Sequence, residues 1–207
     1  MFITFEGIEG CGKSTQIELL FEYLKGKGYR VVKTREPGGT GLGEALRGVL
    51  LQKELRVLPL SELLLFMAVR VEHIEEVILP VLSGGGIVLC DRFMDATYAY
   101  QGYGRGIDLG IIGTLNRLAT KGVMPNLTVL LDCEVETGLG RKLAGNPHKD
   151  RFEKEDVSFH EKIRSAYLKL AEEDQKRFFV VDGKQDIETI HRTIRDKAVR
   201  LLESHGV

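Results

Sequence analysis

The sequence predicts an α/β fold in which a five-stranded parallel sheet is covered by helices on both faces. Short apolar runs alternate along the chain with segments of helical period, as in successive strand–helix units. The runs are almost continuously apolar, which is typical of strands buried on both sides. A glycine-rich loop also separates the first run from the first helix. At 207 residues we expect a single domain over residues 1–207.

The first strand and the helix after it are the clearest pair of elements. Residues 2–5 are apolar except for one threonine, as expected of a buried strand. From Lys13 onward a helical period places Ile17, Leu20, Phe21 and Leu24 on one face. Gly26 and Gly28 end this helix.

The next stretch predicts one strand and two helices. Residues 30–34 form a short second strand, and a glycine-rich loop leads into a helix whose apolar face carries Leu46, Val49 and Leu50. A longer helix runs from Pro59 to about Leu79, with Ser61 as its N-cap.

The second half continues the alternation. Three glycines at 84–86 precede a strongly apolar third strand at 87–91, a helix fits 108–121, and residues 127–132 form the fourth strand. The remaining expected elements are a helix at 134–143, a polar mobile loop at 144–153, a helix at about 157–176, a fifth strand at 178–182, and a last helix along Ile187, Ile190, Ile194, Ala198 and Leu201.

Composition argues against several classes of protein. Lys and Arg total 29 and Asp and Glu 30, and the resulting net charge of −1 argues against a dedicated nucleic-acid binder. The apolar run 63–69 is too short to span a membrane, and residues 1–10 lack the features of a signal peptide. Cys11, Cys90 and Cys133 are too few for a disulfide framework, as in a reducing compartment. We expect a cytoplasmic protein with no nucleic-acid or membrane partner.

Residues 7–14, Gly-Ile-Glu-Gly-Cys-Gly-Lys-Ser, match the phosphate-binding loop pattern G-x4-G-K-[ST] between a strand and a helix. Glycines let backbone N–H groups surround an anion, and the helix N-terminus adds a favourable dipole. Lys13 would reach the β- and γ-phosphates of a nucleoside triphosphate, and Ser14 would bind Mg²⁺. The expected nucleotide site comprises Gly7, Ile8, Glu9, Gly10, Cys11, Gly12, Lys13, Ser14 and Thr15.

The rest of the sequence favours phosphoryl transfer over hydrolysis. No Asn-Lys-x-Asp string is present to read guanine, and no glutamate directly follows the strand-end Asp91 or Asp132 to orient water. Phe66 lies one helical turn before Arg70, so an aromatic face and a guanidinium share one side of a helix, which suits a base and a phosphate. Two alternatives are a kinase for another small acceptor and a non-enzymatic module that uses ATP as a switch.

Five segments together resemble bacterial thymidylate kinases. They are FEGIEGCGKST at 5–15, TREPGGT at 34–40, LFMAVR at 65–70, DRF at 91–93 and YQG at 100–102. The resemblance extends from the first strand to the last helix. It implies the P-loop fold of nucleoside-monophosphate kinases, transfer of the γ-phosphoryl group of ATP to dTMP with Mg²⁺ to give dTDP and ADP, and a cytosolic homodimer.

The resemblance also implies a role for each matching residue. Lys13 would hold the ATP phosphates, Ser14 and Asp91 would organise Mg²⁺, Glu9 would contact the 3′-hydroxyl of dTMP, and Phe66 would stack on thymine. The dTMP site would be completed by Arg70, Thr97 and Gln101 at the base, by Tyr100 where a ribose 2′-hydroxyl would lie, and by Arg35, Glu36, Pro37, Arg47 and Arg92 toward the phosphate.

The loop at 144–153 falls where this family has a mobile lid. In the subtype whose phosphate loop lacks a basic residue, as here, the lid supplies a cation to the γ-phosphate. Arg151 is the first candidate and Arg141 the second. Arg92 would share in stabilising the transferred group. After the fifth strand, Gly183 and Lys184 match the loop that packs on adenine.

Overall fold

A computed structural model of the chain describes residues 1–145 and 150–204. At its centre is one sheet of five parallel strands in the order β2-β3-β1-β4-β5. The strands are β1 (Phe2–Glu6), β2 (Val31–Arg35), β3 (Ile87–Asp91), β4 (Leu127–Asp132) and β5 (Phe178–Asp182). The predicted fold class is therefore confirmed, and each predicted strand is present to within one residue at either end.

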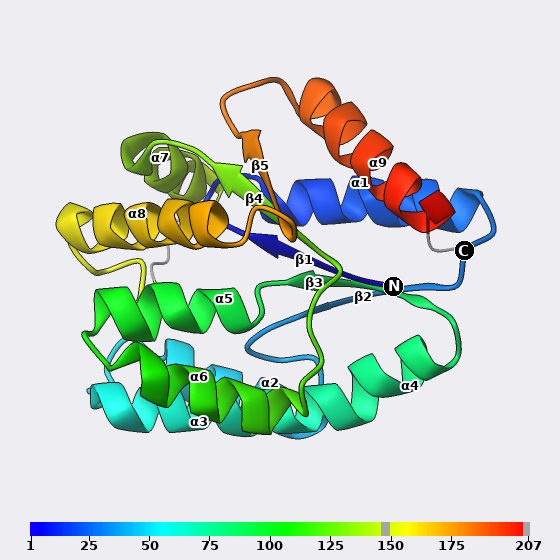
Figure 1. Cartoon of the computed structure of the whole chain (residues 1–207). Coiled ribbons are helices and arrows are strands. Elements are labelled where there is room, and N and C mark those ends of the chain that lie inside the picture. Colours follow the sequence, from blue (N-terminus) through cyan, green and yellow to red (C-terminus); the bar gives the residue numbers. More distant parts are fainter. Residues whose placement is uncertain (146–149, 205–207) are drawn as a thin grey trace.

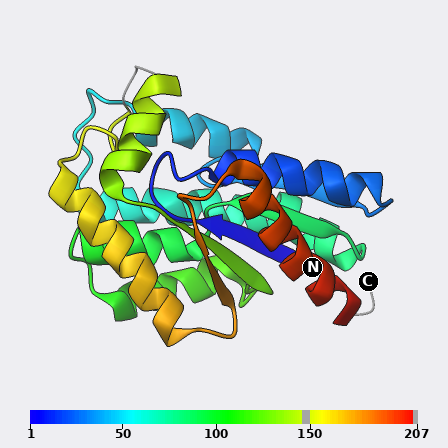
Figure 2. The ribbon, with the colours of Figure 1, turned by 90° about the horizontal axis from the view of Figure 1, so that it is seen from above.

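Helical segments cover both faces of this sheet. They are α1 (Lys13–Gly26), α2 (Gly41–Leu51), α3 (Pro59–His73), the π-helical η1 (Ile74–Ile78), α4 (Leu79–Ser83), α5 (Met94–Thr97), the π-helical η2 (Tyr98–Gly104), α6 (Leu109–Thr120), α7 (Val135–Gly145), α8 (Val157–Glu173) and α9 (Ile187–Ser204). Helices α1 and α9 lie on one side, and α2 to α6 lie on the other (Figure 1). Seen from above, α9 crosses over the strands (Figure 2).

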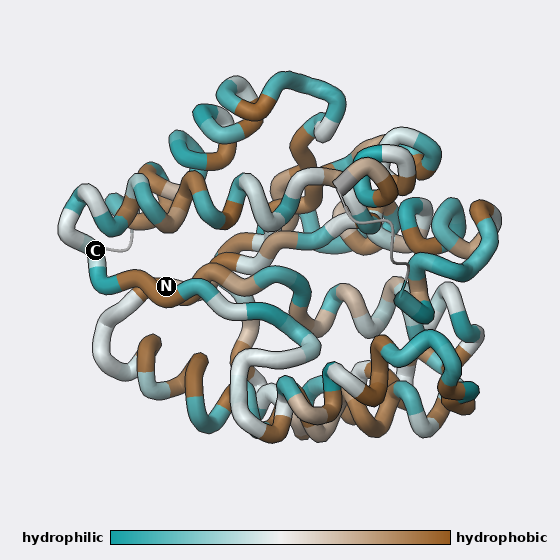
Figure 3. The backbone as a smooth tube through the Cα atoms, turned by 180° about the vertical axis from the view of Figure 1, so that it is seen from behind, coloured by the Kyte–Doolittle hydropathy of each residue, from teal (hydrophilic) through white to brown (hydrophobic). Residues whose placement is uncertain are grey.

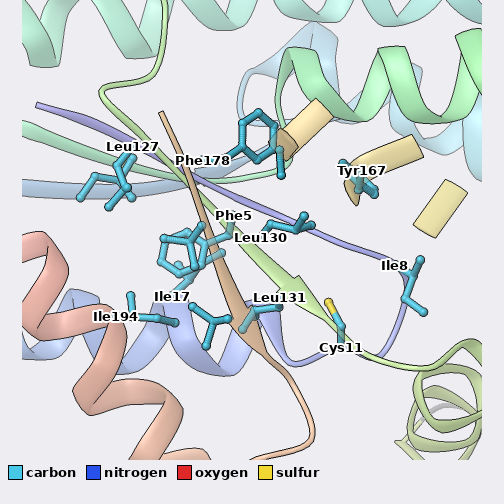
Figure 4. Close-up of a cluster of buried hydrophobic side chains, with 14 of the residues drawn as sticks. Phe5, Ile8, Cys11, Ile17, Leu127, Leu130, Leu131, Tyr167, Phe178 and Ile194 are labelled. Atoms are coloured by element: carbon cyan, nitrogen blue, oxygen red, sulfur yellow. The ribbon is translucent and has the colours of Figure 1, made fainter. Parts of the chain in front are cut away.

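The strands form the apolar centre of the protein. Hydrophobic stretches follow them through the middle of the backbone trace (Figure 3). Phe5 of β1 and Leu131 of β4 are fully buried and pack with Ile17 of α1 and Ile194 of α9 (Figure 4). Because each side chain removed from water contributes on the order of 1.5–3 kcal/mol, this packing holds the sheet between its helices.

The parallel register brings all five carboxyl ends to one edge of the sheet. Phe5 of β1 pairs with Asp91 of β3, and Asp91 also pairs with Arg35 of β2. On the other side Asp132 of β4 pairs with Asp182 of β5. The loops that follow these strands therefore converge, and in open parallel sheets such an edge is where ligands bind.

The long helix predicted from Pro59 to about Leu79 begins where expected, but the helical stretch continues to Ser83 and is not one uniform α-helix. The α-helix ends at His73, and the π-helical η1 carries the chain into α4. The prediction of Ser61 as N-cap is wrong, because the helix begins earlier, with Leu58 as N-cap. Pro59 takes the first helical position, where its missing N–H costs nothing. Val49, expected on a buried face, is 40% exposed.

Two further segments differ from expectation. Periodicity did not indicate α5 or η2, because α5 is a single turn of four residues and η2 winds with a π-helical spacing that a 3.6-residue search does not find. Of the predicted lid at 144–153, residues 144 and 145 belong to α7, residue 150 has no regular structure, residues 151–153 form a turn, and residues 146–149 lie outside the described part of the chain. No helix among the described residues is long and apolar enough to cross a membrane.

Candidate active site

The phosphate loop occupies the predicted position between β1 and α1. Its glycines have left-handed backbone angles that other residues rarely adopt, with φ of 71° at Gly10 and 102° at Gly12. A Cβ on Gly10 would also lie 1.9 Å from the carbonyl oxygen of Gly138 in α7. Gly12 is the N-cap of α1, so the positive end of the helix dipole faces the loop. These features make the loop a cradle for an anion.

Lys13 and Ser14 carry the functional groups of the loop. The Lys13 ammonium is buried and donates to the carbonyl oxygens of Gly7 and Ile8, at 3.0 and 2.7 Å. The Ser14 hydroxyl donates to Oδ2 of Asp91 at 3.1 Å. A hydroxyl and a carboxylate that meet at the end of the loop are hard oxygen donors of the kind that Mg²⁺ prefers.

A cavity of about 1220 Å³ lies beside the loop at the carboxyl edge of the sheet. It brings together most of the predicted site residues from distant parts of the chain. They are Glu9, Gly10, Cys11, Gly12, Lys13, Ser14, Thr15, Arg35, Glu36, Pro37, Arg47, Phe66, Arg70, Asp91, Arg92, Thr97, Tyr100, Gln101, Arg141, Gly183 and Lys184. Of the predicted residues, Gly7, Ile8 and Arg151 are not among those that line it.

Arg92 and Glu9 form an ion pair on the wall of this cavity. Nη2 of Arg92 donates to Oε1 of Glu9 at 3.0 Å, and the Tyr100 hydroxyl donates to the same oxygen at 2.6 Å. Arg92 has a φ of 66°, a left-handed angle that is uncommon for a residue with a side chain. Such local strain persists only where surrounding contacts enforce it, and it concentrates at functional sites.

The charge state of Glu9 follows from this pairing. Burial alone would raise the pKa of Glu9, but the charges of Arg92 and Lys13 hold the pKa well below its usual range. Burial alone would lower the pKa of Arg92, but neighbours that include Glu9 raise it above its usual value. Both groups therefore stay charged, and the cavity wall carries a fixed carboxylate among cations.

Arg70 lies at the base of the cavity and is almost completely buried. Its Nε donates to Oε2 of Glu36 at 2.8 Å, and its Nη1 donates to the Thr97 hydroxyl at 2.9 Å. The two remaining partners are Oδ1 of Asn116 and the carbonyl oxygen of Phe93. The protein therefore positions this guanidinium rigidly on every side.

Aromatic rings line the part of the cavity near Arg70. The ring centroid of Phe152 lies 6.2 Å from that of Phe66 and 5.8 Å from that of Tyr100. Phe66 is only partly buried and lines the cavity. Phe152 lines the same space, although the sequence did not single it out. An apolar slot with a few fixed polar groups suits a planar base.

Gln101 and Arg151 meet at a buried carboxylate. Nε2 of Gln101 donates to Oε1 of Glu62 at 2.7 Å, and Nη1 of Arg151 donates to Oε2 of Glu62 at 2.5 Å. Nε of Arg151 also donates to the carbonyl oxygen of Leu50 at 2.9 Å. In this structure Arg151 thus faces α2 and α3 and not the phosphate loop.

The remaining predicted residues lie around the rim. Arg47 donates to the carbonyl oxygen of Pro37 at 2.7 Å, and Arg35 pairs with Glu44 at 2.9 Å. Arg141 of α7 lines the cavity near the phosphate loop and donates to the carbonyl oxygen of Gly183 at 2.9 Å. Of the two predicted lid cations, Arg141 is the one at the cavity.

Three buried polar residues behind the wall were not predicted. Glu6 at the end of β1 accepts from the Tyr167 hydroxyl at 2.7 Å, and the Tyr167 oxygen accepts from Nη1 of Arg92 at 3.0 Å. The third is Glu62. A polar residue at a position of a strand or helix that is expected to be buried was the sequence signal that could have indicated these three residues. Their hydrogen-bond partners, however, lie far away in the sequence. Local periodicity could not show that Tyr167 contacts Arg92 or that Glu62 contacts Gln101.

The fold and the cavity together define a class of protein. A phosphate loop at the first strand of a parallel sheet, facing a cationic and aromatic acceptor pocket, is the arrangement of a P-loop kinase that acts on a small phosphorylated acceptor.

Comparisons with known proteins identify the family. The thymidylate kinase family model matches residues 5–194. The chain is 54% identical over 194 residues to a thymidylate kinase of Geotalea daltonii, covering 90% of this chain and 91% of that one. It is 52% identical over 196 residues to a thymidylate kinase of Sulfurihydrogenibium sp., covering 94% and 95%. The chain therefore belongs to the thymidylate kinase family, and it is an ATP-dependent phosphotransferase that acts on dTMP.

A solved structure agrees with this assignment. The thymidylate kinase of Ehrlichia chaffeensis superposes on the chain with a TM-score of 0.78 at 38% sequence identity, covering 96% of this chain and 98% of that one. The fold expected from the sequence is confirmed at the level of whole-chain topology.

Proposed function

We propose that one domain, residues 1–207, transfers the γ-phosphoryl group of ATP to dTMP with the residue roles predicted above. The observation that carries this proposal is the convergence of the phosphate loop, Arg92 and the pocket containing Phe66 on one cavity. ATP is held by the loop from Gly7 to Thr15, and its adenine lies against Gly183 and Lys184.

The acceptor dTMP occupies the aromatic side of the cavity. Thymine stacks on Phe66, and Arg70, Thr97 and Gln101 contact its polar edge. Glu9 accepts from the sugar 3′-hydroxyl, and Tyr100 fills the space of a ribose 2′-hydroxyl. The acceptor phosphate lies among Arg35, Arg47 and Arg92, with Glu36 and Pro37 supporting this loop.

The reaction needs positioning and charge screening more than a strong base. The acceptor is already an anion, so the barrier comes from bringing two anionic groups into line. Lys13 and Arg92 both line the cavity where this charge would gather, Lys13 at the start of α1 and Arg92 directly after β3, and each is held by hydrogen bonds. Arg141 is the better placed candidate for a further cation, and Arg151 would have to leave Glu62 to contribute. A lid at 144–153 closing over the cavity would exclude water.

Mg²⁺ is the expected partner of the nucleotide. Ser14 and Asp91 offer two oxygen donors at the end of the phosphate loop. No group of three or more His, Cys, Asp or Glu side chains among the described residues could hold a metal ion alone. Phosphate and water oxygens would complete the coordination shell, as is usual for Mg²⁺. When bound, this ion neutralises charge on the phosphates.

The homodimer is proposed from an apolar surface. Four apolar side chains on α3 and α6 are at least half exposed. They are Leu60 (56%) and Leu64 (50%) of α3, and Ile111 (51%) and Leu118 (76%) of α6. The two helices contact each other on one side of the protein (Figure 1). Large apolar side chains exposed on two neighbouring helices favour a protein interface there. A cytoplasmic location is proposed because ATP is supplied there.

A coupled ADP-release assay tests the proposal. Mg-ATP would be combined with dTMP, dUMP, dCMP, dAMP, dGMP, AMP, UMP or thymidine. Strong release with dTMP, weaker release with dUMP and little with the others is the expected result. A preference for another acceptor would contradict the thymine pocket, and ATP binding without acceptor-dependent release would contradict catalysis altogether.

A further inference from the structure

We propose that Glu62 is a positioning residue that fixes the orientation of the Gln101 side-chain amide, and so makes the acceptor pocket select bases with an N–H at ring position 3. This inference rests on the proposed contact between Gln101 and the base. It adds a residue outside the pocket that decides how Gln101 reads that base.

The contact itself is short and buried. Nε2 of Gln101 lies 2.7 Å from Oε1 of Glu62, and both side chains are almost fully removed from water. Glu62 also forms ion pairs with Nη1 of Arg151 at 2.5 Å and with Nε of Arg105 at 3.5 Å. A carboxylate paired with two guanidinium groups acts only as a hydrogen-bond acceptor.

The hydrogen bond to Glu62 determines whether the nitrogen or the oxygen of the Gln101 amide points toward Glu62. The oxygen and nitrogen of a glutamine amide are nearly equal in shape, so only hydrogen-bond partners distinguish the two orientations. With the amide reversed, the oxygens of Gln101 and Glu62 would face each other at hydrogen-bond distance without a proton between them. Gln101 therefore keeps its nitrogen on Glu62.

The atoms of the Gln101 amide that Glu62 does not use are available to the cavity. Oε1 of Gln101 accepts no hydrogen bond from the residues that the structure describes, and Gln101 lines the cavity beside Phe66 and Thr97. Once Nε2 has used one N–H on Glu62, the amide offers the pocket an acceptor oxygen and one further N–H.

The fixed orientation has a chemical consequence for base selection. Thymine and uracil carry an N–H at position 3 between two carbonyl groups, whereas cytosine carries a lone pair there beside an amino group. An amide free to turn over could match either pattern. An amide held by Glu62 presents its oxygen beside one N–H, in a fixed order that matches the N–H at position 3 and the neighbouring carbonyl oxygen of thymine or uracil. The same order sets its oxygen against the lone pair of cytosine and its N–H against the cytosine amino group. Sites built around such a hydrogen bond discriminate strongly, because the wrong ligand leaves buried polar groups unpaired.

Base selectivity in matched variants tests the proposal. We would measure kcat/KM for dTMP, dUMP and dCMP with the full chain and with Glu62→Gln, whose neutral amide can accept from or donate to Gln101. The kcat/KM ratio of dTMP to dCMP should fall by about 10-fold or more, the scale of one lost discriminating hydrogen bond. The ratio of dTMP to dUMP should not change, because both bases carry the N–H. General damage to the fold would not separate these two ratios.

Two further variants complete the design. Glu62→Asp keeps the negative charge beside Arg151 and Arg105 but shortens its reach, so it tests the proposal if Glu62→Gln does not fold. The exposed Glu76→Gln, in the segment just after α3, should leave both ratios unchanged. An unchanged ratio of dTMP to dCMP in a folded Glu62 variant overturns the inference.

Gln101→Ala separates this inference from the proposed function. If this variant keeps the KM for dTMP and the selectivity over dCMP, then Gln101 does not contact the base and the proposed acceptor site is wrong. If it loses both while the Glu62 variants keep them, the acceptor site stands and only the role of Glu62 fails.

Discussion

Tyr167 donates a 2.7 Å hydrogen bond from its hydroxyl to Oε2 of the buried Glu6, directly behind the cavity wall. The same hydroxyl oxygen accepts from Nη1 of Arg92 at 3.0 Å, and Oε1 of Glu6 accepts from the backbone N–H of Phe93 at 2.7 Å. Glu6 therefore restrains both the backbone just after Arg92 and, through Tyr167, its guanidinium. This explains how a strained backbone angle at Arg92 is maintained.

Replacing Tyr167 by Phe removes one partner of Arg92 while leaving its ring in the core. Because hydrogen bonds to charged groups contribute about 1.5–3 kcal/mol, we expect kcat to fall by about 10-fold with a smaller change in KM for either substrate. Steady-state kinetics with varied dTMP and ATP would measure this. Tyr103→Phe, whose ring also contacts α8 through Lys169, is the matched control and should retain its kcat. A normal kcat in Tyr167→Phe would contradict the positioning role.

Replacing Arg92 itself should lower kcat more than replacing Tyr167, which only positions it. Arg92→Ala removes a cation aimed at the transferred group, and losses of about 10²–10³-fold in kcat are typical of one such donor. Single-turnover measurements with saturating dTMP would isolate the chemical step. A kcat within a few fold of the unchanged enzyme would rule out the assigned role.

Phe66→Ala should separate the two substrate sites. The ring lines the acceptor side of the cavity and lies apart from the phosphate loop on α3, so its loss should raise KM for dTMP more than KM for ATP. Stability should fall as well, because Phe66 packs against core residues. Equal increases in both KM values would indicate general damage to the fold.

Glu6 gives a prediction for the dependence of stability on pH. Burial and the nearby charge of Asp95 raise the pKa of Glu6 to about 8, above the ordinary value of 4.5. Between these two values the folded protein binds a proton that the unfolded chain releases. The free energy of unfolding should therefore fall as pH rises from about 4.5 to 8.

Glu6→Gln removes this titration, so its free energy of unfolding should depend less steeply on pH in that window. Urea unfolding at pH 5, 6, 7 and 8 would measure both proteins. As a control, Glu22→Gln replaces an exposed carboxylate, and its free energy of unfolding should depend on pH as in the wild-type protein. Equal pH dependence in all three proteins would show that Glu6 does not titrate there.

The proposed dimer can be tested on its apolar face. Leu64→Glu places a charge on an exposed side chain of α3, where burial in an interface would be costly. Sedimentation velocity should show a dimer for the unchanged protein and a monomer for this variant. Ile187 on α9 is similarly exposed and its helix lies on the other side of the sheet, so Ile187→Glu should not affect assembly (Figure 1).

Local sequence was a reliable guide wherever one segment carries its own signal. The five strands are continuous apolar runs, and the phosphate loop requires glycines in fixed order before Lys13. The segments resembling the family contributed the acceptor residues, and most of those line the cavity. Local sequence was a poorer guide where spacing departs from 3.6 residues, as in η2, or where a proline starts a helix, as before Ser61.

The order of strands and helices and the anion-binding loop could be predicted from the sequence alone, because each depends on residues close together in the chain. The acceptor residues could be named because short segments resemble those of a known family, although these segments lie far apart in the chain. Only the tertiary structure decided that Tyr167 supports Arg92, that Glu62 holds Gln101, and that Arg151 faces away from the phosphate loop. Those contacts join positions 75, 39 and 89 residues apart. Glu62 lies on α3, Gln101 on η2 and Tyr167 on α8, so the packing of these helices brings the partners together, and hydrogen bonds formed in this way leave no periodic pattern in the sequence.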